Sequence, residues 1–222
     1  MRYLDLLTAL FATVLLVSNV ASTKLVVLGP FTFDGGTLLF PLAYIFGDVL
    51  TEVYGYRKSR RVIWIGFFAL LLATLTFQAV AHLPAPPDAE SQRFGEAFGL
   101  LLGLTPRIVL GSLLAYFLGE FANAYVLAKL KVRTEGRFFW LRAIATTLVG
   151  QGLDTGVFLL VAFYGVFPKE VLLAVFLSNY AFKLGVEALM LPFTYAVVGF
   201  LKRAEGMDAY DRDTDFNPFR LT

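Results

Sequence analysis

The sequence predicts an all-α integral membrane protein, a six-transmembrane-helix bundle with both termini in the cytoplasm. Three observations predict this fold class. The 222 residues are 58% hydrophobic, whereas an average soluble domain is roughly 45–50% apolar. Six apolar stretches occur along the chain, each near the roughly 20 residues that a helix needs to cross the hydrocarbon core. Lys and Arg residues gather in alternate connections between these stretches, which is typical of membrane proteins with a fixed orientation.

The predicted spans follow one another along most of the chain. Their approximate limits are 3–22, 37–61, 62–82, 105–127, 141–164 and 171–201. The last stretch is longer than a span needs and contains Pro192, so we expect it to tilt or kink there. Residues 1–203 are therefore expected to form one transmembrane domain. Residues 204–222 are charged and lack an apolar period, which predicts a loosely ordered cytoplasmic tail.

The positions of the basic residues predict the orientation. One side of the membrane collects Arg2, Arg57, Lys58, Arg60, Arg61, Lys129, Lys131, Arg133, Arg137, Lys202 and Arg203. The opposite side has Lys24, Arg93 and Lys169. Cytoplasmic connections are enriched in Lys and Arg, so the richer side is cytoplasmic. An even number of spans then places both termini on that side.

Two longer connections are predicted on the outer side. Residues 25–36 alternate weakly in polarity and contain Gly-Pro and Gly-Gly. This pattern favours a short hairpin or a lid over an outward-facing pocket. Residues 83–98 are rich in Pro and then polar, which predicts an exposed loop.

Several function classes find no support in the residues. The chain has no Cys, which excludes disulfides, thiolate nucleophiles and cysteine-ligated metals. It contains no GxxxxGK[ST], HExxH or GxSxG motif, the sequence patterns of nucleotide hydrolysis, zinc proteases and serine hydrolases. We therefore expect no metal, no cofactor and no enzymatic activity. The basic connections are explained by topology, so nucleic-acid binding is not expected.

Charged and polar side chains inside the predicted spans carry the functional signal. Asp48 and Glu52 are four residues apart, so both carboxylates project from one helical face. Lys183 and Glu187 have the same spacing and can pair along their helix. The other polar residues of the spans include Ser18, Asn19, Ser22, Glu120, Asn123, Arg142, Gln151, Asp154, Thr155, Asn179 and Tyr180. Ser18, Ser22 and Asn123 are interpreted as helix-packing residues. Pairing between helices explains any one of the others, but the number of charges at membrane depth favours function for the set.

Long segments of the chain resemble the queuosine precursor transporter family, also called the VUT family. The segments are FPLAYIFGDVLTEVYGYRKSRR, SLLAYFLGEFANAYVLAKLK, RAIATTLVGQGLDTGVFLLVAF, NYAFKLGVEALMLPFTY and, in the tail, YDRDTDFNPF. That family is similar to the membrane substrate-binding components of energy-coupling-factor vitamin transporters, which are compact six-helix bundles. The resemblance implies uptake of 7-cyano-7-deazaguanine or 7-aminomethyl-7-deazaguanine, for queuosine in tRNA, across the bacterial cytoplasmic (inner) membrane.

The implied substrate suggests roles for the polar residues. A guanine-like edge offers an N–H and an amino group side by side, which a carboxylate accepts together. Asp154 is the preferred candidate for this carboxylate and Glu187 the second. The carbonyl oxygen of the guanine-like base needs a hydrogen-bond donor, and the flat ring of the base suits aromatic faces. The remaining candidates for substrate binding are Lys183, Gln151, Asn179, Asn19 and Tyr44.

The acids nearer the cytoplasmic half suggest a different role. For Asp48 and Glu52 we consider gating, proton binding and pairing with Arg142. The sequence leaves the energy source, the preferred deazapurine and the oligomeric state open. A substrate-capture subunit that needs a separate ATPase and coupling protein fits the same residues. A small integral-membrane enzyme is a further alternative, although no nucleophile or metal-ligand constellation supports it.

Overall fold

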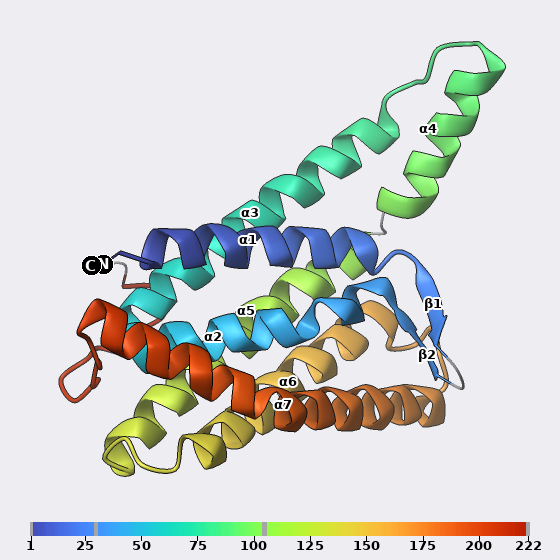
Figure 1. Ribbon diagram of the computed structural model, residues 1–222. Helices are drawn as coiled ribbons and strands as arrows, with labels where there is room; N and C mark the ends of the chain where they lie inside the picture. Colours follow the sequence, from blue (N-terminus) through green and yellow to red (C-terminus); the bar gives the residue numbers. More distant parts are fainter. Residues whose placement is uncertain (1, 29–30, 104–105, 221–222) are drawn as a thin grey trace.

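The computed structural model describes residues 2–28, 31–103 and 106–220, and these form a bundle of α-helices with one small hairpin (Figure 1). The elements in order are α1 (Leu4–Ala21), β1 (Leu25–Leu28), β2 (Phe31–Asp34), a 3-10 turn (Gly35–Leu38), α2 (Phe40–Tyr54), α3 (Tyr56–His82), α4 (Ala89–Leu102), α5 (Pro106–Arg133), α6 (Phe139–Phe163) and α7 (Lys169–Glu205). The all-α class predicted from composition is therefore confirmed.

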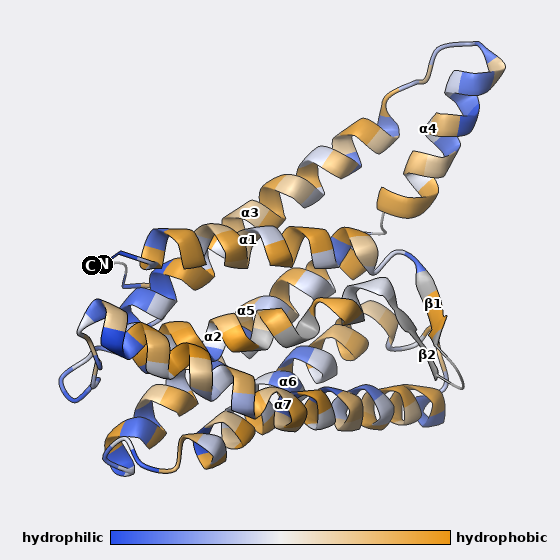
Figure 2. Ribbon diagram, viewed as in Figure 1, coloured by the Kyte–Doolittle hydropathy of each residue, from blue (hydrophilic) through white to orange (hydrophobic). Residues whose placement is uncertain are grey.

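Within the described part of the chain, five helices are long and apolar enough to cross a membrane, namely α1, α3, α5, α6 and α7. Figure 2 shows apolar residues along these helices and hydrophilic residues gathered at the tail, at the α5–α6 connection and on α4. This distribution is that of a multi-pass membrane protein. The remaining predicted span, 37–61, contains α2, which has only 15 residues.

Helix α2 lies inside the bundle, where it packs against α1, α3, α5 and α7. Its residues Val49 and Val53 are fully buried, as are Leu127 of α5 and Ala143 of α6. These side chains form a core at the end of the bundle that also carries the C-terminal tail. The short helix is thus covered by protein on most sides rather than by lipid.

The predicted span 37–61 is wrong in its length, because the helix ends at Tyr54 and α3 begins at Tyr56. Gly55 separates them with φ of 80°, a conformation that residues with a side chain rarely adopt. A Cβ at this position would also lie 3.2 Å from Oδ2 of Asp211. The basic residues that follow therefore form the first turns of α3.

Of the two predictions for the outer connections, one agrees with the structure and one does not. The hairpin predicted for 25–36 is confirmed, since β1 and β2 pair antiparallel with Leu25 opposite Asp34. The loop predicted for 83–98 is wrong, because it contains most of α4. Asp88 caps this helix by accepting a hydrogen bond from the Ser91 N–H at 2.8 Å. Such a cap stabilises a helix start, and α4 projects from the bundle beside the end of α3 (Figure 1).

The C-terminal tail is docked on the helices, so the expectation of a loosely ordered segment is wrong. The backbone N–H of Tyr56 donates to Oδ2 of Asp211 at 2.9 Å, and Asp211 is buried. Arg60 donates to the carbonyl oxygens of Asp215 and Asn217 at 2.9 and 2.6 Å. A polar segment with no apolar period is held in place here by partners about 155 residues away along the chain.

Aromatic side chains add to this docking. Trp64 donates from Nε1 to the carbonyl of Pro218 at 2.7 Å, and its ring lies 6.0 Å from that of Phe219. Phe216 packs against Tyr56, with ring centroids 4.9 Å apart. The tail is therefore an integral part of this end of the bundle.

Helix α7 continues through Pro192 to Glu205. Figure 1 shows the helix changing direction along its length, as the proline predicts. The change of direction brings the last turns of α7 toward α2 and the tail.

Candidate functional site

A cavity of about 420 Å³ lies between α1, α3, α5, α6 and α7. Apolar residues line it together with Ser18 and Asn19 of α1, Ser22 directly after α1, Ser112 and Tyr116 of α5, Asp154, Thr155 and Phe158 of α6, and Asn179 and Lys183 of α7. The volume falls in the range of small-molecule sites, and so does the mixture of apolar walls and a few polar groups. This cavity is the candidate substrate site.

An ion pair between two helices lies in the wall of this cavity. Nζ of Lys183 is 3.0 Å from Oδ2 of Asp154 and 3.2 Å from Oγ1 of Thr155. The Asp154 side chain is 33% exposed and that of Lys183 10% exposed, so the carboxylate remains accessible to a ligand. The pair presents a hydrogen-bond acceptor and a donor side by side in the cavity wall.

The sequence suggested a different partner for Lys183. A spacing of four residues places Lys183 and Glu187 on one face of α7, but it does not show which helix that face meets. Among the described residues, Lys183 forms its ion pair with Asp154 of α6 and not with Glu187.

Two glycines allow α5 and α6 to approach closely next to this pair. A Cβ at Gly119 would lie 2.9 Å from Cβ of Asp154, and a Cβ at Gly150 would lie 2.9 Å from Cβ of Asn123. Both distances are shorter than real Cβ contacts, so only glycine fits without a shift of the helices. Small residues at helix crossings permit this approach in membrane bundles. The crossing fixes Asp154 against α5 while its carboxylate reaches α7.

The cavity includes residues that sequence reasoning missed. Ser18 and Ser22, interpreted as packing residues, line it, and so do Tyr116, Phe158 and Phe163. The hydroxyl of Tyr116 donates to the carbonyl of Ile63 at 3.0 Å, which fixes the ring at the wall. Helical spacing could have found Phe158, because it lies four residues after Asp154 on the same face.

The other predicted substrate residues are divided between this cavity and other parts of the structure. Asn19 and Asn179 line the cavity with Asp154 and Lys183, whereas Gln151 and Glu187 do not. Gln151 lines a smaller cavity with Asp48, and Glu187 is 1% exposed. Tyr44 is on α2, and its side chain lies outside the described part of the structure.

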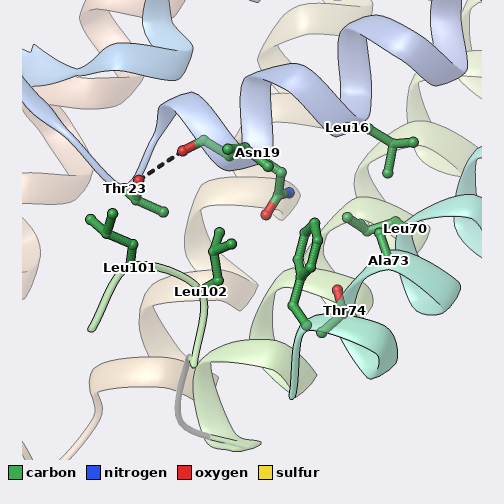
Figure 3. A pocket seen from close by; sticks show the side chains of 10 residues that line it. Leu16, Asn19, Thr23, Leu70, Ala73, Thr74, Leu101 and Leu102 are labelled. Atoms are coloured by element: carbon green, nitrogen blue, oxygen red, sulfur yellow. Dashed lines mark hydrogen bonds between the residues drawn. The ribbon is translucent and has the colours of Figure 1, made fainter. Parts of the chain in front are cut away.

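A second, apolar cavity of about 100 Å³ lies between α1, α3 and the end of α4 (Figure 3). Its walls are mostly Leu, Ala and Phe side chains, and Asn19 and Thr23 are among its few polar residues. Asn19 lines this cavity and the larger one. The scarcity of polar groups makes it a poor site for a polar ligand.

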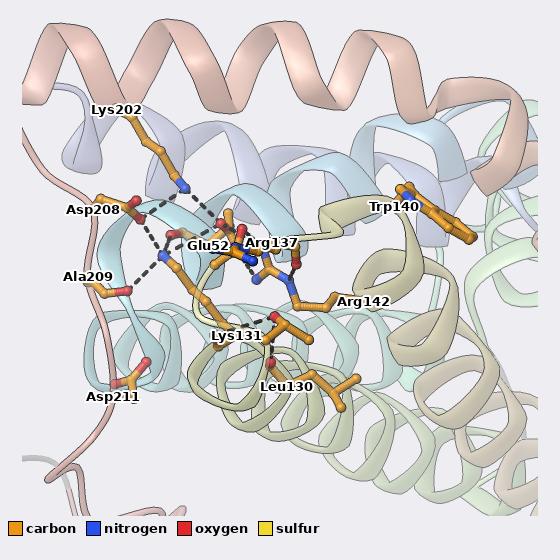
Figure 4. A network of polar contacts seen from close by, with 12 residues as sticks. Glu52, Leu130, Lys131, Arg137, Trp140, Arg142, Lys202, Asp208, Ala209 and Asp211 are labelled. Atoms are coloured by element: carbon orange, nitrogen blue, oxygen red, sulfur yellow. Dashed lines mark hydrogen bonds and ion pairs between the residues drawn. The ribbon is translucent and has the colours of Figure 1, made fainter.

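Glu52 is the centre of a network of charges at the tail end of the bundle (Figure 4). Its carboxylate accepts from Nη2 of Arg142 at 3.2 Å and from Nζ of Lys202 at 2.7 Å. Nζ of Lys131 is 3.6 Å away. Glu52, Arg142 and Lys131 are each 1% exposed. Of the roles considered for Glu52, pairing with Arg142 is therefore the one observed.

The network joins five parts of the chain. Lys131 also donates to the carbonyl of Ala209 at 2.7 Å and to the carboxylate of Asp208 in the tail. Lys202 lies 2.9 Å from the same Asp208 carboxylate. Glu52 thus connects α2 with α5, α6, α7 and the tail. Because several cations surround it, the buried carboxylate is well compensated.

Within the described ranges, no group of three or more His, Asp or Glu side chains could hold a metal ion. The polar groups of the large cavity are instead an ammonium, a carboxylate, amides and hydroxyls. Such a set binds a neutral polar molecule through hydrogen bonds.

Comparison with known proteins connects this architecture to a family. A family model described as "Putative vitamin uptake transporter" matches residues 34–197. The chain is 36% identical over 188 residues to the "Probable queuosine precursor transporter" of Bacillus subtilis (strain 168), covering 84% of this chain and 80% of the relative. It is 26% identical to the "Queuosine precursor transporter" of Escherichia coli (strain K12), over 73% of this chain and 71% of the relative.

No solved structure matches the chain significantly. The family match covers most of the chain, including α2 and the residues of the cavity on α5, α6 and α7. The chain therefore belongs to the queuosine precursor transporter family, also called the VUT family.

Proposed function

We propose that the protein takes up a queuosine precursor across the bacterial cytoplasmic membrane, for tRNA modification. The substrate in this proposal is 7-cyano-7-deazaguanine or 7-aminomethyl-7-deazaguanine, and the protein acts as a transporter rather than an enzyme. The observation that carries the proposal is the Asp154–Lys183 pair in the wall of a 420 Å³ cavity between the helices. The names of the relatives support the same substrate class.

The pair complements the edge of a guanine-like base. The ring N–H and the exocyclic amino group are adjacent donors, which the Asp154 carboxylate can accept together. The carbonyl oxygen beside the ring N–H accepts from the Lys183 ammonium, which lies 3.0 Å from that carboxylate. Phe158 and Tyr116 in the walls offer faces for the flat ring. The pair therefore matches the order of donors and acceptor along this edge.

Other side chains complete the proposed binding set. Asn19 and Asn179 line the cavity and provide amide groups for the substituent of the ring. Tyr44 is proposed as a further aromatic face. Gln151 and Glu187 remain candidates that reach the substrate only after a helix shift, since both lie outside the cavity lining.

The location of the cavity suggests how uptake proceeds. Its lining includes Asn19 and Ser22 near the hairpin end of α1. The Glu52 network joins the helices to the tail, and Figure 1 shows the tail at the end of the bundle opposite the hairpin. We propose that α2 is the sixth span and that both termini are cytoplasmic, which places the hairpin outside. The structure then corresponds to a state closed toward the cytoplasm, and Glu52 and Arg142 form the gate that must separate for release.

Uptake is tested in cells that cannot synthesise the precursor, by measuring queuosine in tRNA. The chain is expressed alone, and the cells receive a low concentration of 7-cyano-7-deazaguanine. We expect restored queuosine, which would show uptake without a dedicated partner. No queuosine together with binding to the purified protein would favour a capture subunit that needs an ATPase and a coupling protein. No queuosine and no binding would reject the proposed substrate.

A further inference from the structure

A small cavity lies beside the substrate site, between α2, α5 and α6. Its volume is about 10 Å³, close to the minimum that holds one water molecule. The polar side chains that line it are Asp48, Glu120, Asn123, Thr147 and Gln151. Except for Gln151, none of these has a role in the substrate site proposed above.

Asp48 is incompletely satisfied in this cavity. The side chain is buried, with 2% of the residue exposed. Its Oδ1 accepts a hydrogen bond from Nδ2 of Asn123 at 3.3 Å. Its Oδ2 has no hydrogen-bond partner among the described residues. A buried carboxylate without compensating partners is unfavourable in its charged form.

The charges around Asp48 do not compensate it. The groups that interact electrostatically with Asp48 are acids as well: Glu187 of α7, Glu52 of the same helix and Glu120 of α5. Glu187 is also buried, and its Oε1 has no hydrogen-bond partner among the described residues. From α6, Asp154 interacts with Glu120.

The nearby cations are engaged by other acids. Arg142, Lys131 and Lys202 pair with Glu52, and Lys183 pairs with Asp154. None of the ion pairs found among the described residues includes Asp48, Glu120 or Glu187. A proton on Oδ2 of Asp48 would remove its charge and turn the unpartnered acceptor into a donor.

We propose that Asp48, in the cavity it shares with Glu120, binds a proton that is co-transported with the substrate. The inference rests on the proposed function and adds the energy source to it. Substrate binding favours the protonated form of Asp48, and the proton is released when the Glu52 gate opens to the cytoplasm.

The two cavities are physically linked, which is what co-transport requires. Gln151 of the small cavity and Asp154 of the substrate site are three residues apart on α6, so a shift of α6 moves both. Gly119, which precedes Glu120, lies at the α5–α6 crossing that fixes Asp154. Binding at one site therefore changes the free energy of binding at the other, and the effect is reciprocal.

The number of protons that the protein takes up on binding the nucleobase tests the proposal. Calorimetric titrations of the purified wild-type protein with 7-cyano-7-deazaguanine are run at one pH in buffers of different ionisation enthalpy. We expect the protein to take up a proton, up to about one per bound nucleobase. The Asp48→Asn variant should bind the nucleobase without proton uptake, because its side chain is already neutral. Asp5→Asn, at an exposed position on α1, is the matched control and should behave as the wild type.

Several results would overturn the inference. Wild-type binding with no proton exchanged at any pH tested would do so, as would binding that requires Na⁺ and is independent of pH. Unchanged proton uptake in Asp48→Asn would also contradict it. If that variant does not fold, unchanged uptake in Glu120→Gln, which removes the charge of an acidic neighbour of Asp48, would do so. No binding by the wild type would reject the proposed function itself, and the coupling with it.

Discussion

Glu52 is the residue on which the closed end of the bundle depends most. Its carboxylate is 1% exposed and compensates Arg142, Lys131 and Lys202 together. Removal of the carboxylate would leave the buried Arg142 without a carboxylate partner among the described residues, and Lys131 and Lys202 would keep only Asp208. Such uncompensated buried charge is costlier than the absence of the whole network.

The Glu52→Gln variant should therefore be strongly destabilised, by roughly 3–5 kcal/mol. Thermal unfolding of the purified protein in detergent measures this effect. Glu96→Gln, at an exposed position on α4, is the control and should leave the unfolding temperature nearly unchanged. Equal unfolding temperatures for the two variants would show that the network contributes little.

Gly119 permits the helix crossing that places Asp154. A Cβ at this position would lie 2.9 Å from Cβ of Asp154 and 3.1 Å from the carbonyl oxygen of Gly150. Gly119→Ala should separate α5 from α6, lower the stability by about 1–3 kcal/mol and weaken substrate binding. Gly185→Ala is the matched control, because a Cβ on Gly185 meets nothing within 4 Å. A Gly119→Ala protein as stable as Gly185→Ala would contradict the close crossing.

At the scale of elements, the sequence predicted the long helices but not their breaks. Hydropathy identified α1, α3, α5, α6 and α7 because each is apolar over a membrane thickness. It could not place the break at Gly55, whose surroundings include Asp211 of the tail, distant in sequence. The docking of the tail was missed for the same reason, since backbone groups of distant segments are its partners. Helix α4 was missed because its composition resembles that of a loop.

The candidate site was predictable to a similar degree. Polar residues inside apolar spans are conspicuous, and four of them, Asn19, Asp154, Asn179 and Lys183, line one cavity. The sequence could not show which helix faces meet, so it paired Lys183 with Glu187 instead of Asp154. The aromatic walls were missed because Phe is common throughout this chain.

The docking of the tail should depend on pH. Hydrogen bonding from the Asn217 N–H, together with Arg220, lowers the pKa of Asp215 below its ordinary value of 3.8. Burial opposes ionisation of Asp208, but hydrogen bonds from Lys131 and Lys202 outweigh it and lower its pKa as well. A pKa lowered in the folded state stabilises docking above the ordinary value, and this contribution is lost as the pH falls through the lowered pKa.

We therefore expect the tail to detach in acid before the helices unfold. Hydrogen exchange of 207–220, followed from neutral to acidic pH, measures the detachment. Asp208→Asn should detach at a higher pH than the wild type, because it lacks the carboxylate that pairs with Lys131 and Lys202 of the helices. Exchange that does not respond to pH in either protein would contradict this role of the carboxylates.

At the scale of the whole molecule, the two ends of the bundle differ in construction. The tail end combines a packed core, the Glu52 network and the docked tail, whereas the end with the hairpin contains the cavity. In the proposed transport cycle the packed end must open and the cavity must close. The charges of the Glu52 network favour this role, because paired ions at helix ends can exchange partners without exposure of the apolar core.

The central claim is that the Asp154–Lys183 pair recognises a deazaguanine, and equilibrium binding to the purified protein tests it most directly. The affinity for 7-cyano-7-deazaguanine is measured for the wild type, for Asp154→Asn and for the control Glu96→Gln. Loss of a charge-assisted pair of hydrogen bonds, about 1.5–3 kcal/mol, should weaken binding by roughly 10- to 150-fold in Asp154→Asn. The control should retain the wild-type affinity. Equal affinities for Asp154→Asn and the wild type, with both proteins folded, would contradict the assignment of this site.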